Sequence, residues 1–272
     1  MSIMIPSFIV MSLISFIFGI GLAFASNKLA VKVDERVVLL KGALPGINCG
    51  ACGFAGCQDY ANAIIFHNAP LNKCSPGGKE TSEKISNIMG VSAQISEKMV
   101  AKVLCIGGYQ EASSSKEYQG IKTCAAANLT KSAKDCPFGC LGFGDCTLVC
   151  PFDAIHMNDN GLPVVDEDKC TGCGLCVKAC PRNIIELAPF SAYLTVNCRS
   201  KDRGPVVQKY CKVGCIGCGI CVKACNGEGI YMENNLAIVD YKAYKGDGTP
   251  AVKCPKKTIV FQQAKYEKMI KV

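Results

Sequence analysis

The sequence predicts an α+β protein in which one N-terminal membrane helix is followed by small domains that fold around clustered cysteines. Three observations support this prediction: an apolar stretch without charge over residues 3–25, 21 cysteines among 272 residues, and cysteine runs followed by strand-like segments. Such a cysteine share usually means a disulfide scaffold in a short secreted chain. This chain is long and its cysteines are closely spaced, with several followed by Pro, so metal ligation by thiolates is the better interpretation.

The first segment, residues 1–26, contains the stretch IMIPSFIVMSLISFIFGIGLAFA. As a helix it would extend about 35 Å, enough to cross a hydrocarbon core of about 30 Å. A cleaved signal peptide is the alternative, but no basic residue precedes the stretch, and it is longer than a signal peptide's apolar region. Lys28, Lys32 and Arg36 follow it. The positive-inside rule therefore predicts a single-pass anchor in the cell membrane, with most of the chain in the reducing cytoplasm.

The second segment, residues 27–101, contains a C-x2-C-x4-C-x16-C group within and after NCGACGFAGC. Glycines let backbone amides approach a cluster and donate hydrogen bonds to its sulfurs. We expect one four-iron cluster here, since a zinc site, the alternative, usually uses two CxxC pairs with a longer spacer. Residues 75–101 are expected to form a small helical connector. The predicted ligands are Cys49, Cys52, Cys57 and Cys74.

The third segment, residues 102–190, carries the pattern of bacterial two-cluster ferredoxins, in which the fourth cysteine of each run binds the other cluster. The middle cysteine of the first run is replaced by Phe143, and Cys136 is the natural substitute upstream. The segments DAIHM, GLPVVDEDK and NIIEL are expected to supply the short strands of this module. One cluster is assigned to Cys136, Cys140, Cys146 and Cys180, and the other to Cys150, Cys170, Cys173 and Cys176.

The fourth segment, residues 191–272, is a partly degenerate repeat of the third. KDCPFGCLGFGDCTLVCPFDAI aligns without a gap with KYCKVGCIGCGICVKACNGEGI, which pairs Cys136 with Cys211 and Phe143 with Cys218. In the second half of the repeat, Tyr244, Asp247 and Pro250 stand where ligands would be, and one cysteine remains. A fourth cluster is therefore assigned to Cys215, Cys218, Cys221 and Cys254.

Five cysteines have no assigned role. Free cysteines are often buried as small apolar side chains, and a further metal site shared between the repeats is the alternative. The two interpretations stay open for Cys105, Cys124, Cys198, Cys211 and Cys225.

The formal charge of +8 gives no support for nucleic-acid binding. Each oxidised cluster with four thiolates carries about −2, so four clusters bring the balance to about zero. No basic stripe with interleaved aromatics is present. The sequence also contains no nucleotide-binding or nucleophile motif, so we expect no catalytic residues and no substrate chemistry by this chain alone.

The anchor, the C-x2-C-x4-C-x16-C group and the tandem ferredoxin modules together resemble the B-subunit family of the Rnf electron transport complexes, especially in GCLGFGDC and CTGCGLCVKACP. The resemblance covers nearly the whole chain. The cysteine sets above predict three [4Fe-4S] clusters and a fourth. The resemblance implies that such clusters accept electrons from soluble ferredoxin. It also implies that the chain passes them on within a membrane complex that reduces NAD and translocates ions.

The resemblance further implies two kinds of neighbour, a C subunit with flavin and NAD sites and the integral membrane subunits. Basic side chains near exposed clusters, for example Lys178, Arg182 and Lys223, could steer an acidic ferredoxin, although ordinary solvated side chains are the alternative. Two other functions remain: a ferredoxin-like subunit of another membrane oxidoreductase, and a membrane-anchored zinc scaffold without redox activity.

Overall fold

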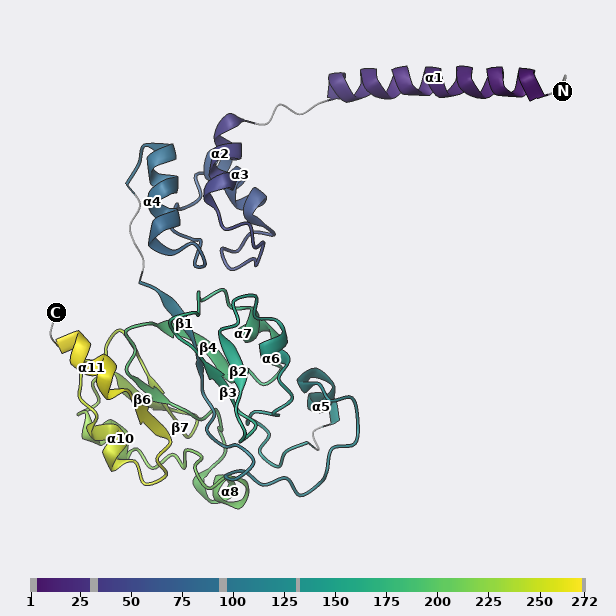
Figure 1. Ribbon diagram of the computed structural model, residues 1–272. Helices are drawn as coiled ribbons and strands as arrows, with labels where there is room; N and C mark the ends of the chain where they lie inside the picture. Colours follow the sequence, from purple (N-terminus) through teal and green to yellow (C-terminus); the bar gives the residue numbers. More distant parts are fainter. Residues whose placement is uncertain (1–3, 30–33, 93–96, 131–132, 271–272) are drawn as a thin grey trace.

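The computed structural model describes residues 4–29, 34–92, 97–130 and 133–270. Ile3 in the predicted span, Lys32 after it and residues 93–96 of the predicted connector lie outside the described residues. Figure 1 shows a long N-terminal helix, a small helical domain and a larger part built from short strands and helices. The mixed helix and strand content confirms the predicted α+β class.

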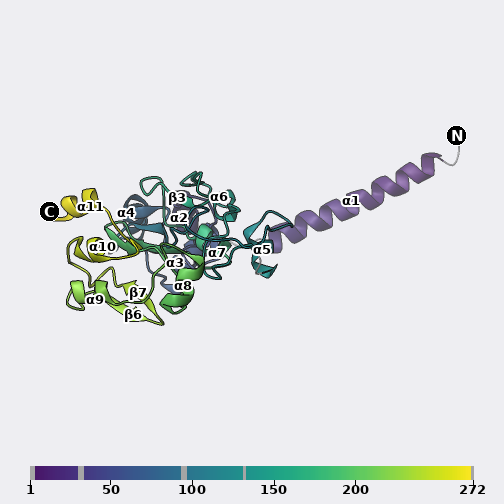
Figure 2. The ribbon, with the colours of Figure 1, turned by 90° about the horizontal axis from the view of Figure 1, so that it is seen from below.

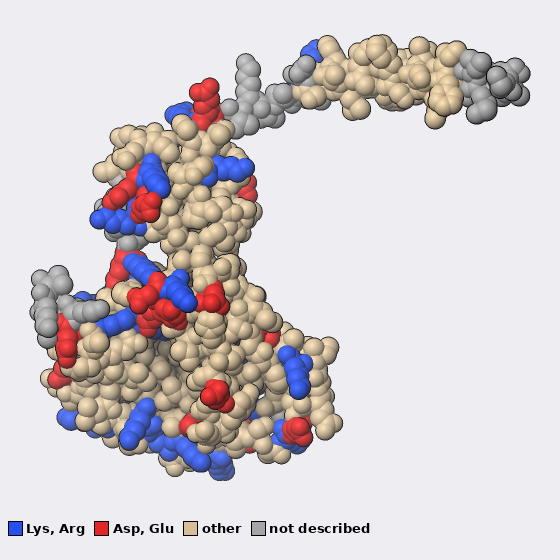
Figure 3. Space-filling view, viewed as in Figure 1, with Lys and Arg blue, Asp and Glu red and all other residues tan. Residues whose placement is uncertain are grey.

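The N-terminal helix α1, Met4–Leu29, stands apart from the other elements. Its apolar window Phe8–Ser26 has a mean hydropathy of 2.5, and none of it is buried against the chain. In two perpendicular views the helix extends away from the rest (Figures 1 and 2). In Figure 3 the described part of its visible surface carries charge only at one end, and Lys28 lies in the last turn of the helix. Such an apolar surface is stable in contact with lipid, so the helix is compatible with membrane association.

The small helical domain contains α2, Glu35–Ala43, α3, Cys57–His67, and α4, Gly78–Met89. These helices pack through a core that includes Leu40, Tyr60, Ile64 and Ile85, each at most 1% exposed. The prediction of a helical connector is confirmed by α4, and its Ile85 belongs to this core. The Tyr60 hydroxyl donates a 2.6 Å hydrogen bond to the carbonyl of Pro70 and accepts one of 3.2 Å from the amide of Lys73. These bonds hold the loop that leads to Cys74.

The first ferredoxin-like module is built on two antiparallel strand pairs. Strand β1 pairs with β4 at the end of the module, and β2 pairs with β3 as a hairpin. The predicted strands are confirmed. The elements in chain order are β1, Met99–Val103; α5, Cys124–Thr130; α6, Asp145–Leu148; β2, Ile155–Met157; β3, Pro163–Val165; α7, Leu175–Ala179; and β4, Ile185–Pro189.

The second module repeats this arrangement. Strand β5 pairs with β8, and β6 pairs with β7 as a hairpin, so the pairs correspond to β1 with β4 and β2 with β3. Helices α9 and α10 correspond to α6 and α7. The elements are β5, Leu194–Val196; α8, Gly204–Tyr210; α9, Ile220–Ala224; β6, Ile230–Glu233; β7, Leu236–Val239; α10, Thr249–Lys253; β8, Ile259–Phe261; and α11, Gln263–Ile270.

Two carboxylates join the modules. Glu167, between β3 and α7, accepts hydrogen bonds from Lys102 at 2.6 Å, from Gln262 at 3.1 Å and from Lys265 on α11. Glu186 on β4 pairs with Arg199 and accepts a 2.8 Å hydrogen bond from the Tyr241 hydroxyl. The modules are therefore held together by ion pairs at their junction.

Candidate metal centres

The four predicted ligands in the helical domain lie together. Cys57 is the first residue of α3, and its amide donates a 2.8 Å hydrogen bond to Asn48 Oδ1. Burial raises the pKa of the Cys74 thiol to about 11, and the neighbouring thiols of Cys57, Cys52 and Cys49 add to the rise. Four thiols in one place, one of them buried, can hold a group that carries positive charge.

The second predicted set also comes together. Cys150, Cys170, Cys173 and Cys176 line one hollow of about 350 Å³ beside α7. The last three come from a single loop and the start of α7, whereas Cys150 follows α6. The loop reverses at Gly172, whose φ is +69° and which has the carbonyl of Met99 where a side chain would project. This position therefore requires glycine.

At the other site of the first module, one predicted residue does not lie with the other three. Cys140, Cys146 and Cys180 line a hollow of about 360 Å³, but the fourth cysteine there is Cys124 and not Cys136. Cys124 begins α5, and its amide and that of Ala125 donate hydrogen bonds of 2.8 and 3.0 Å to the carboxylate of Asp145 on α6.

Cys136 is held away from this hollow. The Arg182 guanidinium donates to the carbonyls of Cys136 and Gly139 at 2.6 and 3.1 Å and thereby fixes the Cys136 loop. Arg182 is consequently half-buried, whereas Lys178 and Lys223 are exposed.

The second module contains the predicted fourth set. Cys215, Cys218, Cys221 and Cys254 line a hollow of about 360 Å³, and Cys218 is exposed. The degenerate site of this module is filled by apolar packing. Tyr244 is 4% exposed and lies in a core that also contains Tyr193, Phe261 and Cys225. Aromatic side chains thus occupy the region where ligands were lost.

These hollows fit [4Fe-4S] clusters better than single ions. Each of three hollows has four thiols in its lining. Burial raises the pKa of Cys140 and Cys146 to about 12 and that of Cys176 and Cys221 to about 11. As thiolates, these buried sulfurs need a cationic partner. Throughout the described ranges, no three Cys, His, Asp or Glu side chains are grouped so that they could hold one metal ion.

Sequence reasoning missed Cys124 as a lining residue. It also left open Cys105, Cys198 and Cys211, which line a further hollow with Cys136. A signal for two of them exists in the repeat, because Cys105 and Cys198 each follow the first strand of their module by two residues.

Comparison with protein families agrees with this arrangement. A model described as a putative Fe-S cluster matches residues 44–76, a 4Fe-4S dicluster domain matches residues 136–187, and a 4Fe-4S binding domain matches residues 214–232. The fold and the thiol-lined hollows define a ferredoxin-type iron–sulfur protein that carries [4Fe-4S] clusters.

Comparison with curated proteins identifies the family. The chain is 44% identical to the B subunit of the proton-translocating ferredoxin:NAD(+) oxidoreductase complex of Clostridium ljungdahlii, over 94% of this chain and 91% of the relative. It is 42% identical to the B subunit of the Na(+)-translocating complex of Acetobacterium woodii, over 90% of this chain and 74% of the relative. It is 38% identical to the B subunit of the ion-translocating oxidoreductase complex of Methanosarcina acetivorans, over 95% of this chain and 98% of the relative. The chain belongs to this family of Rnf-type B subunits.

Proposed function

We propose that this chain is the membrane-anchored electron-transfer subunit of an ion-translocating ferredoxin:NAD oxidoreductase complex. It acts as one subunit of that enzyme complex and has no substrate chemistry of its own. Reduced soluble ferredoxin is the donor, and the flavin- and NAD-binding C subunit and the integral membrane subunits are the neighbours. Helix α1 crosses the cell membrane once, and the remaining chain lies on the cytoplasmic side, in agreement with Lys28 and Arg36 after the span.

Four cysteine sets hold the clusters in this proposal. The first module uses Cys124 in place of Cys136, and the other sets are those predicted. A [4Fe-4S] cluster supplies reversible transfer of one electron. The protein holds the sulfurs in place, buries them and tunes their charge. The ligand sets are Cys49, Cys52, Cys57 and Cys74; Cys150, Cys170, Cys173 and Cys176; Cys124, Cys140, Cys146 and Cys180; and Cys215, Cys218, Cys221 and Cys254.

The observation that supports a relay is the adjacency of successive sets. Cys49 of the helical domain lies close enough to Cys173 for their charges to interact. A side chain added at Gly50 would lie 3.7 Å from Lys178 Nζ, so the helical domain approaches α7 directly. Within the first module, Cys146 interacts in the same way with Cys176 of the neighbouring set. Electrons would thus pass from one set to the next without a long gap.

The predicted domains are an anchor at residues 1–26, a cluster domain with its connector at 27–101, a two-cluster module at 102–190 and a partly degenerate module at 191–272, and we propose them with one change. Strand β1 crosses the boundary after residue 101 and pairs with β4. The start of the first module therefore moves to Met99.

The test uses the full chain, purified in detergent without oxygen. Iron and acid-labile sulfide are measured per chain, and reduction is followed by visible absorbance and paramagnetic resonance. Cys173→Ala and Cys124→Ala are each expected to remove about four irons and to stop transfer from reduced ferredoxin to the C subunit. Cys225→Ala, a half-buried cysteine outside the four sets, is the matched control and should retain all iron.

Two results would overturn the proposal. A colourless wild-type protein that contains zinc and no sulfide would exclude a redox role. Unchanged iron in Cys124→Ala would exclude the revised ligand set and restore Cys136 to that site.

A further inference from the structure

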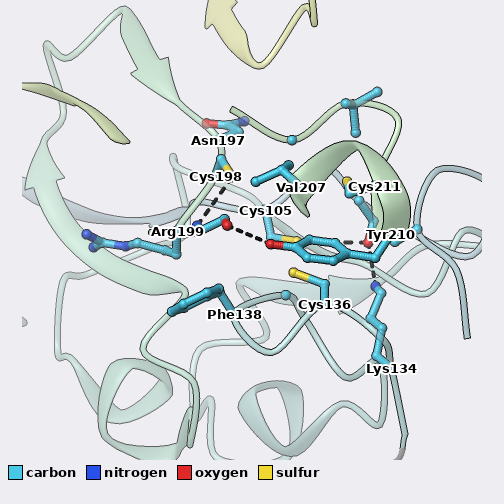
Figure 4. A pocket seen from close by; sticks show the side chains of 16 residues that line it. Cys105, Lys134, Cys136, Phe138, Asn197, Cys198, Arg199, Val207, Tyr210 and Cys211 are labelled. Atoms are coloured by element: carbon cyan, nitrogen blue, oxygen red, sulfur yellow. Dashed lines mark hydrogen bonds between the residues drawn. The ribbon is translucent and has the colours of Figure 1, made fainter. Parts of the chain in front are cut away.

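Four cysteines that belong to none of these sets surround one hollow at the junction of the two modules. Cys105, Cys136, Cys198 and Cys211 all line it (Figure 4), and its volume is about 370 Å³. Each of the three hollows assigned to clusters above is likewise lined by four thiols. Cys136 and Cys211 are 7% and 8% exposed.

The four thiols form two equivalent pairs, one from each module. Cys105 follows β1 by two residues, and Cys198 follows the corresponding strand β5 by two residues. Cys136 and Cys211 occupy the same position at the head of the aligned cysteine runs. Each module therefore supplies one thiol after its first strand and one thiol before its first cluster loop.

Backbone amides face these sulfurs in the same repeated pattern. The Cys140 amide donates to Cys105 Sγ at 3.4 Å, and the amide of Cys215, the residue aligned with Cys140, faces Cys198 Sγ. The amides of Phe138 and Gly139 face Cys136 Sγ. Those of Val213 and Gly214, the aligned residues, face Cys211 Sγ. Amide hydrogen bonds to ligand sulfur are a feature of iron–sulfur sites.

A buried cation beside the hollow supplies charge complementarity. Lys134 lines the hollow, is 8% exposed and donates to the carbonyls of Gly107 and, at 2.9 Å, of Cys140. Neither of these partners carries a charge. A buried ammonium needs a negative group nearby, and a cluster with four thiolates, at about −2, provides one.

We propose that Cys105, Cys136, Cys198 and Cys211 bind a fifth [4Fe-4S] cluster that bridges the two modules. Its place in the relay rests on the function proposed above. Cys105 contacts the backbone of Cys140, a ligand of the Cys124 set, and Cys198 lies beside Cys215, a ligand of the last set. The fifth cluster therefore connects the first module to the second, and the series becomes continuous from the helical domain to the exposed Cys218.

Geometry favours a cluster over the other chemistry open to four thiols. A tetrahedral zinc ion holds its sulfurs about 3.8 Å apart, because each Zn–S bond is about 2.3 Å. In the part of the chain that the structure describes, no such group that could hold a single ion is found, and all four cysteines are free thiols. The sulfurs surround a space and do not converge on a point.

The test is the iron content of the full chain in detergent, prepared without oxygen and enriched in ⁵⁷Fe for Mössbauer spectroscopy. Wild type should contain about 20 irons per chain, four for each of five sites. Cys211→Ala and Cys198→Ala should each lower this to about 16, with sulfide falling in parallel. Cys225→Ala is the control and should keep about 20.

The outcomes separate this inference from the proposed function. Wild type with about 16 irons, and no loss in Cys211→Ala or Cys198→Ala, would overturn the fifth cluster and leave the four-cluster relay intact. One zinc ion per chain that is lost in the same variants would also overturn it. If a variant fails to fold, the wild-type count and its Mössbauer intensity still distinguish 20 irons from 16. Wild type without iron would refute both proposals.

Discussion

Replacing Glu167 with Gln removes one of the two carboxylates that join the modules. Its side chain is 16% exposed, and those of its partners Lys102 and Lys265 are 7% and 20% exposed. Loss of one partner of a buried ion pair costs about 3–5 kcal/mol, because a buried charge is left uncompensated. Gln keeps one oxygen that accepts a hydrogen bond, so we expect a cost of about 3 kcal/mol.

The assay is the rate at which the full chain loses its visible cluster absorbance in urea under anaerobic conditions. Unfolding with cluster loss is irreversible, so a rate replaces an equilibrium. If the substitution destabilises only the native state and not the transition state for unfolding, the cluster absorbance is lost faster by on the order of 100-fold. The control is Glu83→Gln on α4, where the pair with Lys79 is 3.7 Å apart with side chains 55% and 67% exposed. Such an exposed pair contributes under about 1 kcal/mol.

The effect of Glu167→Gln should depend on pH. Burial alone would raise the pKa of Glu167, but hydrogen bonds from Lys102, Lys265 and Gln262 hold it below its ordinary value of 4.5. A carboxyl group with a lowered pKa stabilises the fold above its unfolded pKa and loses this contribution as pH falls through the folded value. The difference between wild type and variant in the rate of cluster loss is therefore largest at pH 7 and becomes smaller below about pH 4.5. Equal rates of cluster loss at pH 7 would refute the reasoning.

Two further substitutions test local structure. Gly217→Ala should destabilise the last cluster site by about 1–3 kcal/mol more than Gly219→Ala. Both residues have a φ of +69°, but only at Gly217 would the new methyl group lie against a backbone atom, 2.8 Å from the carbonyl oxygen of Asn235. Equal melting temperatures of the two variants would contradict this. Tyr60→Phe should lower the stability of the helical domain by about 1–2 kcal/mol, because the Pro70 carbonyl and the Lys73 amide lose their hydrogen-bond partner. On heating, the paramagnetic resonance signal of the cluster in this domain should be lost before the other cluster signals.

Much of the fold follows from local sequence signals. Strand-like segments and cysteine spacing along one loop, as in Cys170, Cys173 and Cys176, are properties of neighbouring residues, and the structure brings these three together. The fourth lining residue comes from elsewhere in the chain. The spacing of Cys150 to the later run follows a known pattern, so it was predictable.

The exchange of Cys124 for Cys136 was not predictable from spacing. Cys136 lies nearer in the sequence to Cys140, but Asp145 binds the start of α5 and brings Cys124 to the hollow, while Arg182 holds the Cys136 loop. These contacts join residues far apart in the chain and have no signature in local periodicity. The hollow between the modules was not predictable for the same reason, because its lining forms only when both repeats lie side by side.

The pairing of β1 with β4 has a consequence for synthesis of the protein. On the ribosome, residues 99–103 emerge long before residues 185–189, so the nascent strand has no partner strand until β4 is translated. The same delay separates Cys124 from Cys180. If Cys124 and Cys180 bind one cluster, as proposed, that cluster can be completed only after the hairpin and α7 have left the exit tunnel.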